Sequence, residues 1–243
     1  MAVGSGTRET TEKHTKRTGI LLVSLGAKHA RPESIELAVA RAEGLCGTLL
    51  VCALDTAEII NREVLHDESK ESAQRYLDGV VSTLESATKK CSGRIQVKFI
   101  RMSEFVSDPS YEKFHLIVSR AYEEDGAFQR HIDNQTFRNL QPVLMRMGIQ
   151  RRNDPRISAL AEYLLFELAL ILFVSEDGIA DIQFGNEPEM GVVDSVFSDK
   201  YDAFRLTFRR WQVQIPRNYR VARSGVSGQF GVDDPLGFLL PVE

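Results

Sequence analysis

The chain has 243 residues, of which 43% are hydrophobic and 26% charged, and this suits one large globular domain. Its net charge of −4 argues against a general nucleic-acid binder, which would need a concentrated positive face. The three cysteines, Cys46, Cys52 and Cys91, show neither CxxC spacing nor a Cys/His cluster. They therefore predict no disulfide framework and no zinc site, and indicate a reducing, cytoplasmic compartment.

The ends of the chain differ in composition from its middle. Residues 1–18 are polar and of mixed charge, without the apolar core of a secretory signal, and are predicted to be a disordered arm. Residues 19–243 are expected to form a single domain, with an irregular tail from about residue 217 that is rich in glycine and turn residues. The chain is expected to be a monomer.

The first elements predict a parallel sheet. The apolar run from Gly19 to Ser24 suits a strand buried on both faces, and Pro32 can begin a helix that ends near Gly44 or Gly47. A second buried strand follows from Thr48. Strand, helix and strand in this order form the crossover unit of a Rossmann-like α/β fold, with three layers and a central, mainly parallel sheet.

The remaining elements continue this pattern. A long helix is expected from near Ala57, capped by Asp55 or Thr56 and extending past Leu84. Further along, the pattern predicts a strand from 94, helical structure over 110–147, a buried helix over 157–174, a strand over 179–184 and another around 192–196, whereas residues 204–215 suit a helix or a strand equally.

Ser24 is the first candidate for chemistry because it ends the first predicted strand. Ligands bind at the carboxyl edge of the sheet in open α/β folds. A hydroxyl that satisfies a strand end or turn is the structural alternative. The loop after Ser24 is neither a P-loop nor a GxGxxG fingerprint, and GxSxG is absent, so no nucleotide cofactor and no hydrolase triad are predicted.

Tyr163 and Glu167 are the second candidate. Four residues apart in a helix, they share one face. A carboxylate in so apolar a helix needs a partner, either a substrate ammonium or an arginine of the core. The run from Tyr163 to Val174 is too short for a bilayer span of about 20 residues, so no membrane contact is expected. The five histidines show no metal-ligand spacing, which predicts no metal.

Four segments together resemble the cyclodipeptide synthases. They are the strand ending in Ser24, the stretch LLVCALDTAEI, the stretch AYEEDGAFQRHIDNQTFRNL, and the helix with Tyr163-Leu-Leu-Phe-Glu167. The resemblance runs from about Gly19 to Phe197. It implies a fold similar to the catalytic domain of class I tyrosyl- and tryptophanyl-tRNA synthetases, and an activity that joins two aminoacyl-tRNAs into a 2,5-diketopiperazine without ATP or another cofactor.

The resemblance also implies roles for residues. Ser24 would receive the first aminoacyl group as an ester, and Tyr163 and Glu167 would hold its ammonium. The backbone amides around Leu25 and Gly26 are plausible oxyanion donors from their position. The substrate pocket is expected to contain Leu22, Gly26, Ala27, Asp55 and Asp194.

The sequence departs from the family in two places. The family has a catalytic tyrosine about twenty residues beyond the glutamate, where this chain has Glu187-Pro188. Glu187 is the candidate replacement, with Asp194 or Tyr201 as alternatives if the alignment shifts and a surface turn as the structural alternative. Ala27 stands where one subgroup has asparagine, which is closer to the second subgroup.

Acidic residues suggest one substrate. Glu187, Glu189 and Asp194 would suit a guanidinium, which pairs bidentately with carboxylates. The chain thus resembles a subgroup that makes arginine-containing cyclodipeptides, and arginyl-tRNA is the hypothesis for one of its two aminoacyl-tRNA partners.

The tRNA surface is predicted from basic residues. In the family the long helix after the second strand contacts tRNA, and here Arg75, Lys89 and Lys90 lie on it among many acids, including Glu58. The arginine-rich stretch with Arg205, Arg209 and Arg210 is therefore expected to contribute. Two other functions stay open: an aminoacyl transferase that does not cyclise its product, and a domain that only binds tRNA.

Overall fold

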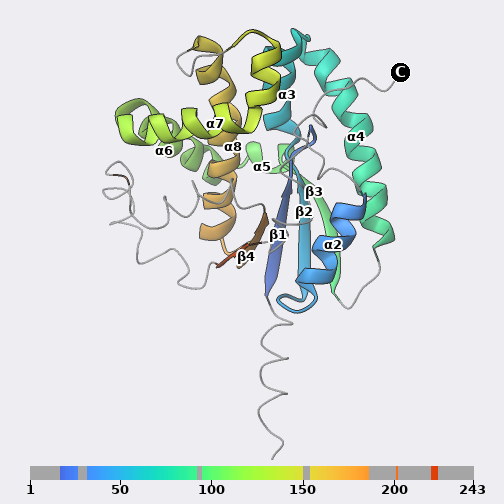
Figure 1. The fold of residues 1–243 in the computed structure, drawn as a ribbon. Helices are drawn as coiled ribbons and strands as arrows, with labels where there is room; N and C mark the ends of the chain where they lie inside the picture. Colours follow the sequence, from blue (N-terminus) through green and yellow to red (C-terminus); the bar gives the residue numbers. More distant parts are fainter. Residues whose placement is uncertain are drawn as a thin grey trace, which may run out of the picture.

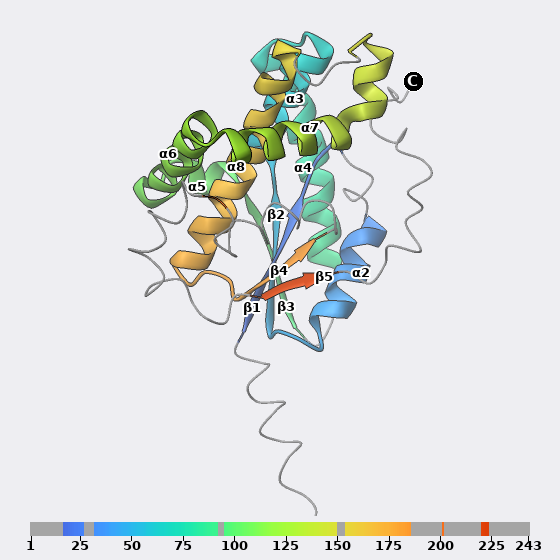
Figure 2. The ribbon, with the colours of Figure 1, turned by 60° about the vertical axis from the view of Figure 1, so that its left-hand side comes forward.

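The computed structural model describes residues 17–26, 32–91, 95–149, 154–185, 201 and 220–223. In this part of the chain a central sheet is covered by helices on both faces (Figure 1). Two of them, α2 and α4, lie on one side, while α6 and α8 lie on the other, as the rotated view also shows (Figure 2). The predicted three-layer, Rossmann-like α/β arrangement is confirmed.

The strands and helices follow one another in the order expected of this fold. The strands are β1 (Thr18–Val23), β2 (Thr48–Ala53), β3 (Gln96–Arg101), β4 (Ile182–Gly185) and β5 (Arg220–Arg223). The helices are α2 (Pro32–Ala42), α3 (Asp55–His66), α4 (Lys70–Lys90), α5 (Ser103–Val106), α6 (Pro109–Glu124), α7 (Gly126–Arg146) and α8 (Pro155–Glu176).

All pairs in the sheet are parallel, in the order β3-β2-β1-β4-β5. β1 pairs with β2 so that Leu22 lies opposite Cys52 and Val23 opposite Ala53. Because β2 lies on one side of β1 and β4 on the other, the order of the strands reverses at β1. Such a switch point opens a crevice at the carboxyl ends of the strands, where this kind of fold binds its ligands.

Two hydrophobic cores lie on the two faces of the sheet. Ile20 and Leu22 of β1 pack on the side of α8, whereas Leu21 and Val23 pack on the side of α2 and α4. Side chains of a strand alternate between its faces. By this alternation Ser24, directly after the strand, is expected on the same face as Ile20 and Leu22. The sequence of β1 thereby aims Ser24 toward the layer that contains α8.

The prediction of one long helix after β2 is wrong. Asp67 adopts the left-handed conformation, with φ of 53°, and ends α3. A new helix, α4, begins after Ser69, whose side chain accepts a hydrogen bond from the amide of Ser72. The expected cap of α3 is also absent, because its N-cap is Leu54 and no side chain caps it. Aspartate tolerates the left-handed region better than most residues, which explains the break.

Helix α8 is a core helix, as predicted. Its 22 residues are long and apolar enough to cross a membrane by length and composition alone. However, 72% of its most apolar window is buried inside the protein, against the sheet and α6. Burial on nearly every side explains why its sequence is apolar all round.

The predicted tail differs from the structure in one respect. Arg220–Arg223, expected to be irregular, form β5 and pair in parallel with β4. Thr18, assigned to the predicted arm, already belongs to β1. The predictions for residues 1–16, 192–196 and 204–215 lie outside the described residues.

Close packing at Gly19 leads to a stability prediction. A Cβ at Gly19 would lie 2.5 Å from Cε2 of Phe184, a buried ring of β4. Gly19→Ala is therefore expected to lower the free energy of unfolding by about 1–3 kcal/mol, because overpacking forces the ring to move. The midpoint of urea unfolding measures this.

The matched control is Gly79→Ala in the exposed middle of α4, where a Cβ would meet nothing within 4 Å. Alanine there should raise stability by roughly 0.5–1 kcal/mol, because glycine weakens a helix. An unchanged midpoint for Gly19→Ala would contradict the packing argument.

Candidate active site

Ser24 lies at the carboxyl end of β1, at the switch point of the sheet. It is half-buried, and its hydroxyl donates a hydrogen bond to Oε2 of Glu58 at 3.3 Å. Glu58 belongs to the first turns of α3, which starts two residues after β2 ends. Because β1 and β2 are neighbours, the end of one strand and the helix that follows the other meet here.

Glu58 is one of the few buried acidic residues of the described chain. Its side chain is 5% exposed and has no charged partner within ion-pair distance among the described residues. The amide of Gly26 hydrogen-bonds to it, and Nδ2 of Asn61 donates to Oε2 at 3.5 Å. Its direct partners among the described residues are thus neutral hydrogen-bond donors.

Burial raises the pKa of Glu58 from its ordinary 4.5 to about 7. The hydrogen bonds from Ser24, Asn61 and Gly26, and the positive charge of Arg62, act in the opposite direction but do not offset the loss of solvation. A carboxyl group in this state gains and loses its proton near neutral pH.

Glu58 was not predicted as a site residue from the sequence, where it counted only as one of the acids that dilute the charge of a long helix. The pattern that could have indicated Glu58 is the spacing of polar residues along α3. Buried positions of α3 include Asp55, Ala57, Glu58, Ile59 and Asn61, so polar residues recur on the face turned into the protein. Glu58 and Asn61 are three residues apart on this buried face, in the first turns of the helix that follows β2. Polar residues at such positions lie next to the crevice at the carboxyl ends of the strands.

Tyr163 and Glu167 occupy one face of α8 and are both buried, with 9% and 7% exposure. Tyr163 is part of the core between α8 and the sheet. Burial raises the pKa of the Cys52 thiol, and the negative charges of Asp55, Glu104 and Glu167 raise it further. Helix α8, which carries both residues, packs on the same side of the sheet as Ile20 and Leu22 of β1.

The predicted pocket residues take different positions. Leu22 is half-buried against the core on the α8 side. A Cβ at Gly26 would lie 2.4 Å from Oε1 of Glu58, so glycine permits the close approach of the loop to this carboxylate. The amide of Gly26 hydrogen-bonds to Glu58, and its expected role as an oxyanion donor stays a prediction.

Asp55 is also engaged in the structure. Its carboxylate accepts hydrogen bonds from the amide and hydroxyl of Ser103, at 3.0 and 2.7 Å, and from the amide of Thr56 at 2.9 Å. These contacts fasten α5 to the start of α3. A role of Asp55 in substrate binding stays a prediction.

Several predicted site residues lie outside the described residues: Ala27, Glu187, Asp194, Arg205, Arg209 and Arg210. Tyr201, an alternative for the missing tyrosine, is described. It is 4% exposed, packs its ring on Phe128 at 5.1 Å between centroids, and turns its hydroxyl toward Nδ1 of His131. Tyr201 is therefore fastened to α7.

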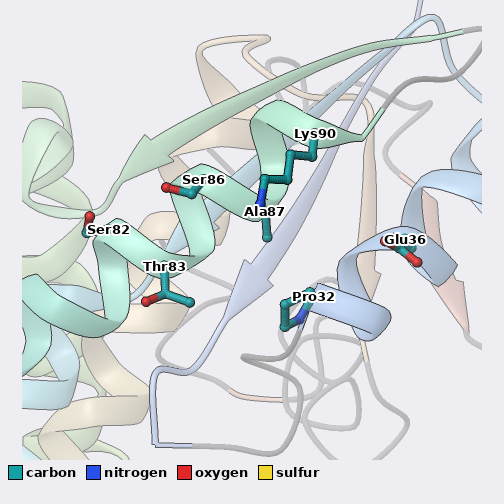
Figure 3. A pocket seen from close by; sticks show the side chains of 7 residues that line it. All are labelled: Pro32, Glu36, Ser82, Thr83, Ser86, Ala87 and Lys90. Carbon is teal, nitrogen blue, oxygen red and sulfur yellow. The ribbon is translucent and has the colours of Figure 1, made fainter.

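The basic residues predicted on α4 are exposed. Lys89 pairs with Glu85 at 2.7 Å, and the Nε of Arg75 donates to the backbone carbonyl of Glu71 at 3.4 Å. Lys90 lines a shallow surface hollow of about 330 Å³ between the start of α2 and the second half of α4 (Figure 3). None of the residues that line this hollow is Ser24, Glu58, Tyr163 or Glu167, so it is separate from the candidate site.

No cluster of three His, Cys, Asp or Glu side chains suited to a metal ion occurs within the described ranges.

The fold is shared with solved cyclodipeptide synthases. One from Fluoribacter dumoffii is 13% identical, with a TM-score of 0.66 over 89% of this chain and 92% of the other. One from Candidatus Glomeribacter gigasporarum, bound to Phe-tRNAPhe, is 16% identical, with a TM-score of 0.54 over 86% and 87%.

A third similar structure comes from Mycobacterium tuberculosis, and its description relates cyclodipeptide synthetases to type I tRNA synthetases. It is 13% identical, with a TM-score of 0.57 over 76% of this chain and 79% of the other. No protein-family model and no curated protein matches the sequence. At these identities the similarity establishes the fold, and the reaction has to be argued from the site.

Proposed function

We propose that the chain is a cyclodipeptide synthase that condenses two aminoacyl-tRNAs into a 2,5-diketopiperazine through an aminoacyl ester on Ser24. The observation that carries the proposal is the position of Ser24 at the switch point of a fold shared with cyclodipeptide synthases over 89% of the chain. Tyr163 and Glu167, buried on the same face of the sheet, add support as the site for an ammonium group.

The reaction needs no activation beyond that of its substrates. In the first step Oγ of Ser24 bonds to the carbonyl carbon of the aminoacyl group, and the bond from that carbon to the tRNA ribose oxygen breaks. One ester replaces another, so the step is nearly balanced. The amine of the bound residue then attacks a second aminoacyl-tRNA ester, and the new amine attacks the ester on Ser24. Each of these steps forms an amide from an ester, which is downhill.

The role of the protein in this scheme is to position groups and stabilise charge. A carboxylate on α8 would attract the ammonium of the first aminoacyl group, and the Tyr163 hydroxyl would hydrogen-bond to it. Both lie on a helix buried against the sheet, which keeps them fixed relative to Ser24. The aminoacyl-tRNA substrates are supported by the neighbour that binds Phe-tRNAPhe.

Arginine is proposed as one of the two amino acids. This proposal rests on the acidic residues Glu187, Glu189 and Asp194 of the sequence, which would pair with a guanidinium. It is independent of the choice of Ser24 as nucleophile.

The test is product analysis. The purified full chain is incubated with total tRNA charged with all twenty amino acids, and the products are searched by mass spectrometry for cyclic dipeptides, with isotope-labelled arginine in a parallel sample. We expect a diketopiperazine that carries the arginine label and that deacylated tRNA does not give.

The other outcomes point elsewhere. A diketopiperazine without the label would reject arginine but keep the reaction. A linear aminoacylated amine would favour a transferase that does not cyclise. No product, with tRNA still bound, would favour a binding domain.

A further inference from the structure

Glu58 has contacts that the fold alone does not require. Its Oε2 accepts from the Ser24 hydroxyl at 3.3 Å, its other oxygen faces the Gly26 backbone, and it is 5% exposed. Burying a carboxyl group among neutral partners costs free energy, which an apolar side chain at this position would not. A buried acid beside a candidate nucleophile is typical of an acid-base catalyst.

We propose that Glu58 is the general base that takes the proton of Ser24 when its oxygen attacks an acyl carbon, and that returns this proton when the serine is released. The proposal deepens the function proposed above and rests on Ser24 as its nucleophile. It concerns how Ser24 is activated, so it holds for any acyl donor that enters the site.

Among the described residues no ion pair explains Glu58. The nearest basic side chain on its helix, Arg62, is bound to Glu68 through Nε at 2.9 Å and through a second nitrogen. The same guanidinium lies over the ring of Tyr76, 3.6 Å from its centroid. Arg62 therefore has partners of its own and leaves Glu58 to Ser24, Asn61 and Gly26.

Asn61 suits a group that changes its protonation state. In the structure its Nδ2 donates to the Glu58 carboxylate, while its buried Oδ1 has no hydrogen-bond partner among the described residues. Rotation of the amide would let Oδ1 accept a hydrogen bond from a protonated Glu58. Asn61 can thus act as a positioning residue for both forms of the acid.

The proton balance closes over the two steps in which the Ser24 ester forms and is released. When the Ser24 ester forms, the hydroxyl proton moves to Oε2 of Glu58, and the departing ribose oxygen takes a proton from the acid so formed. When the second amine attacks that ester, Glu58 accepts a proton from the amine and Oγ of Ser24 leaves with it. Glu58 ends each cycle as it began, without a further reactant.

The pKa of about 7 suits this role, because a base is most effective when its pKa is near the working pH. Titratable groups on its own helix are Asp55 and Arg62, and the two helices packed on α3 carry Tyr163 and Glu167 (α8) and Tyr76 (α4). Of these, Arg62 lowers the pKa of Glu58 through its charge. A variant at Glu58 is needed to assign a pH profile to it.

The experiment measures the nucleophilicity of Ser24 directly. The full chain is treated with p-nitrophenyl acetate between pH 5 and 9, and the acetyl adduct on Ser24 is quantified by peptide mass spectrometry. In the unmodified protein we expect the rate to rise with pH through one transition near 7, because the base form is the carboxylate. Glu58→Gln should lower the rate by at least roughly a hundredfold and remove the transition.

Two controls separate catalysis from folding. Glu63→Gln makes the same change on the exposed side of α3 and should leave the rate and its profile unchanged. Glu58→Asp keeps a carboxylate but shortens the side chain, and should retain part of the rate together with the pH transition.

The outcomes are distinct from those of the product assay. Equal rates and profiles for Glu58→Gln and the unmodified chain would overturn the proposal, as would the absence of any adduct on Ser24 in the unmodified chain across this pH range. Labelling that depends on Glu58, without a cyclic dipeptide from charged tRNA, would keep the proposal and reject the proposed function.

Discussion

Ser24→Ala is expected to abolish both the aminoacyl adduct on the protein and the cyclic dipeptide, with a loss of at least about a thousandfold in rate. The reason is that alanine leaves no atom at the end of β1 to carry the first aminoacyl group. Intact-protein mass spectrometry after mixing with charged tRNA measures the adduct, and product analysis measures the dipeptide.

The control for this prediction is Ser24→Cys. A thiol there would form a thioester in place of the ester, so an adduct should still be found. Because Ser24 is half-buried and makes one hydrogen bond within the described part of the chain, removal of its hydroxyl should leave the fold intact. A cyclic dipeptide made by Ser24→Ala at the original rate would show that the acyl group is transferred directly between substrates.

Glu167→Gln is expected to lower the rate of adduct formation by roughly a hundredfold at limiting aminoacyl-tRNA. The substitution keeps the size of the side chain but removes the charge that would attract the ammonium, and a buried charge-assisted hydrogen bond contributes about 1.5–3 kcal/mol. Single-turnover measurements over a range of tRNA concentrations should show the loss mainly as weaker binding of the aminoacyl group.

Glu162→Gln on the same helix is the matched control. Its side chain is 41% exposed and approaches His115 at 3.4 Å, so its charge is solvated and lies away from the core. We expect it to react like the unmodified chain. If both variants lost the same activity, or neither lost any, Glu167 would not be the ammonium site.

The sequence predicted the elements that carry strong local patterns. The buried runs at Gly19 and Thr48 became β1 and β2, and the apolar run from Ile157 became the core of α8, because continuous hydrophobicity and length decide these elements. The break at Asp67 was missed, because the apolar stripe passes through it and one residue in an unusual conformation leaves no periodic trace. β5 was missed since four residues in a glycine-rich tail form a strand only by pairing with β4.

The candidate site was predicted in part. Ser24 could be identified from the end of its strand, and Tyr163 with Glu167 from their spacing in an apolar helix. Glu58 could not be found by counting charges along a helix. Without the structure, an acid at this position is interpreted as solvent-exposed, because the sequence does not show which face of the helix packs against β1 and β2. Its importance depends on the adjacency of β1 and β2, which is a property of the sheet.

The buried Glu58 also affects how the folded and unfolded states bind protons. Its pKa is about 7 in the fold, against 4.5 for an unperturbed glutamate, so between these values the folded chain holds a proton that the unfolded chain has released. Its contribution to the free energy of unfolding therefore decreases as the pH rises from 4.5 to 7, and does not recover above 7. A chain selected for stability alone would carry an uncharged residue here.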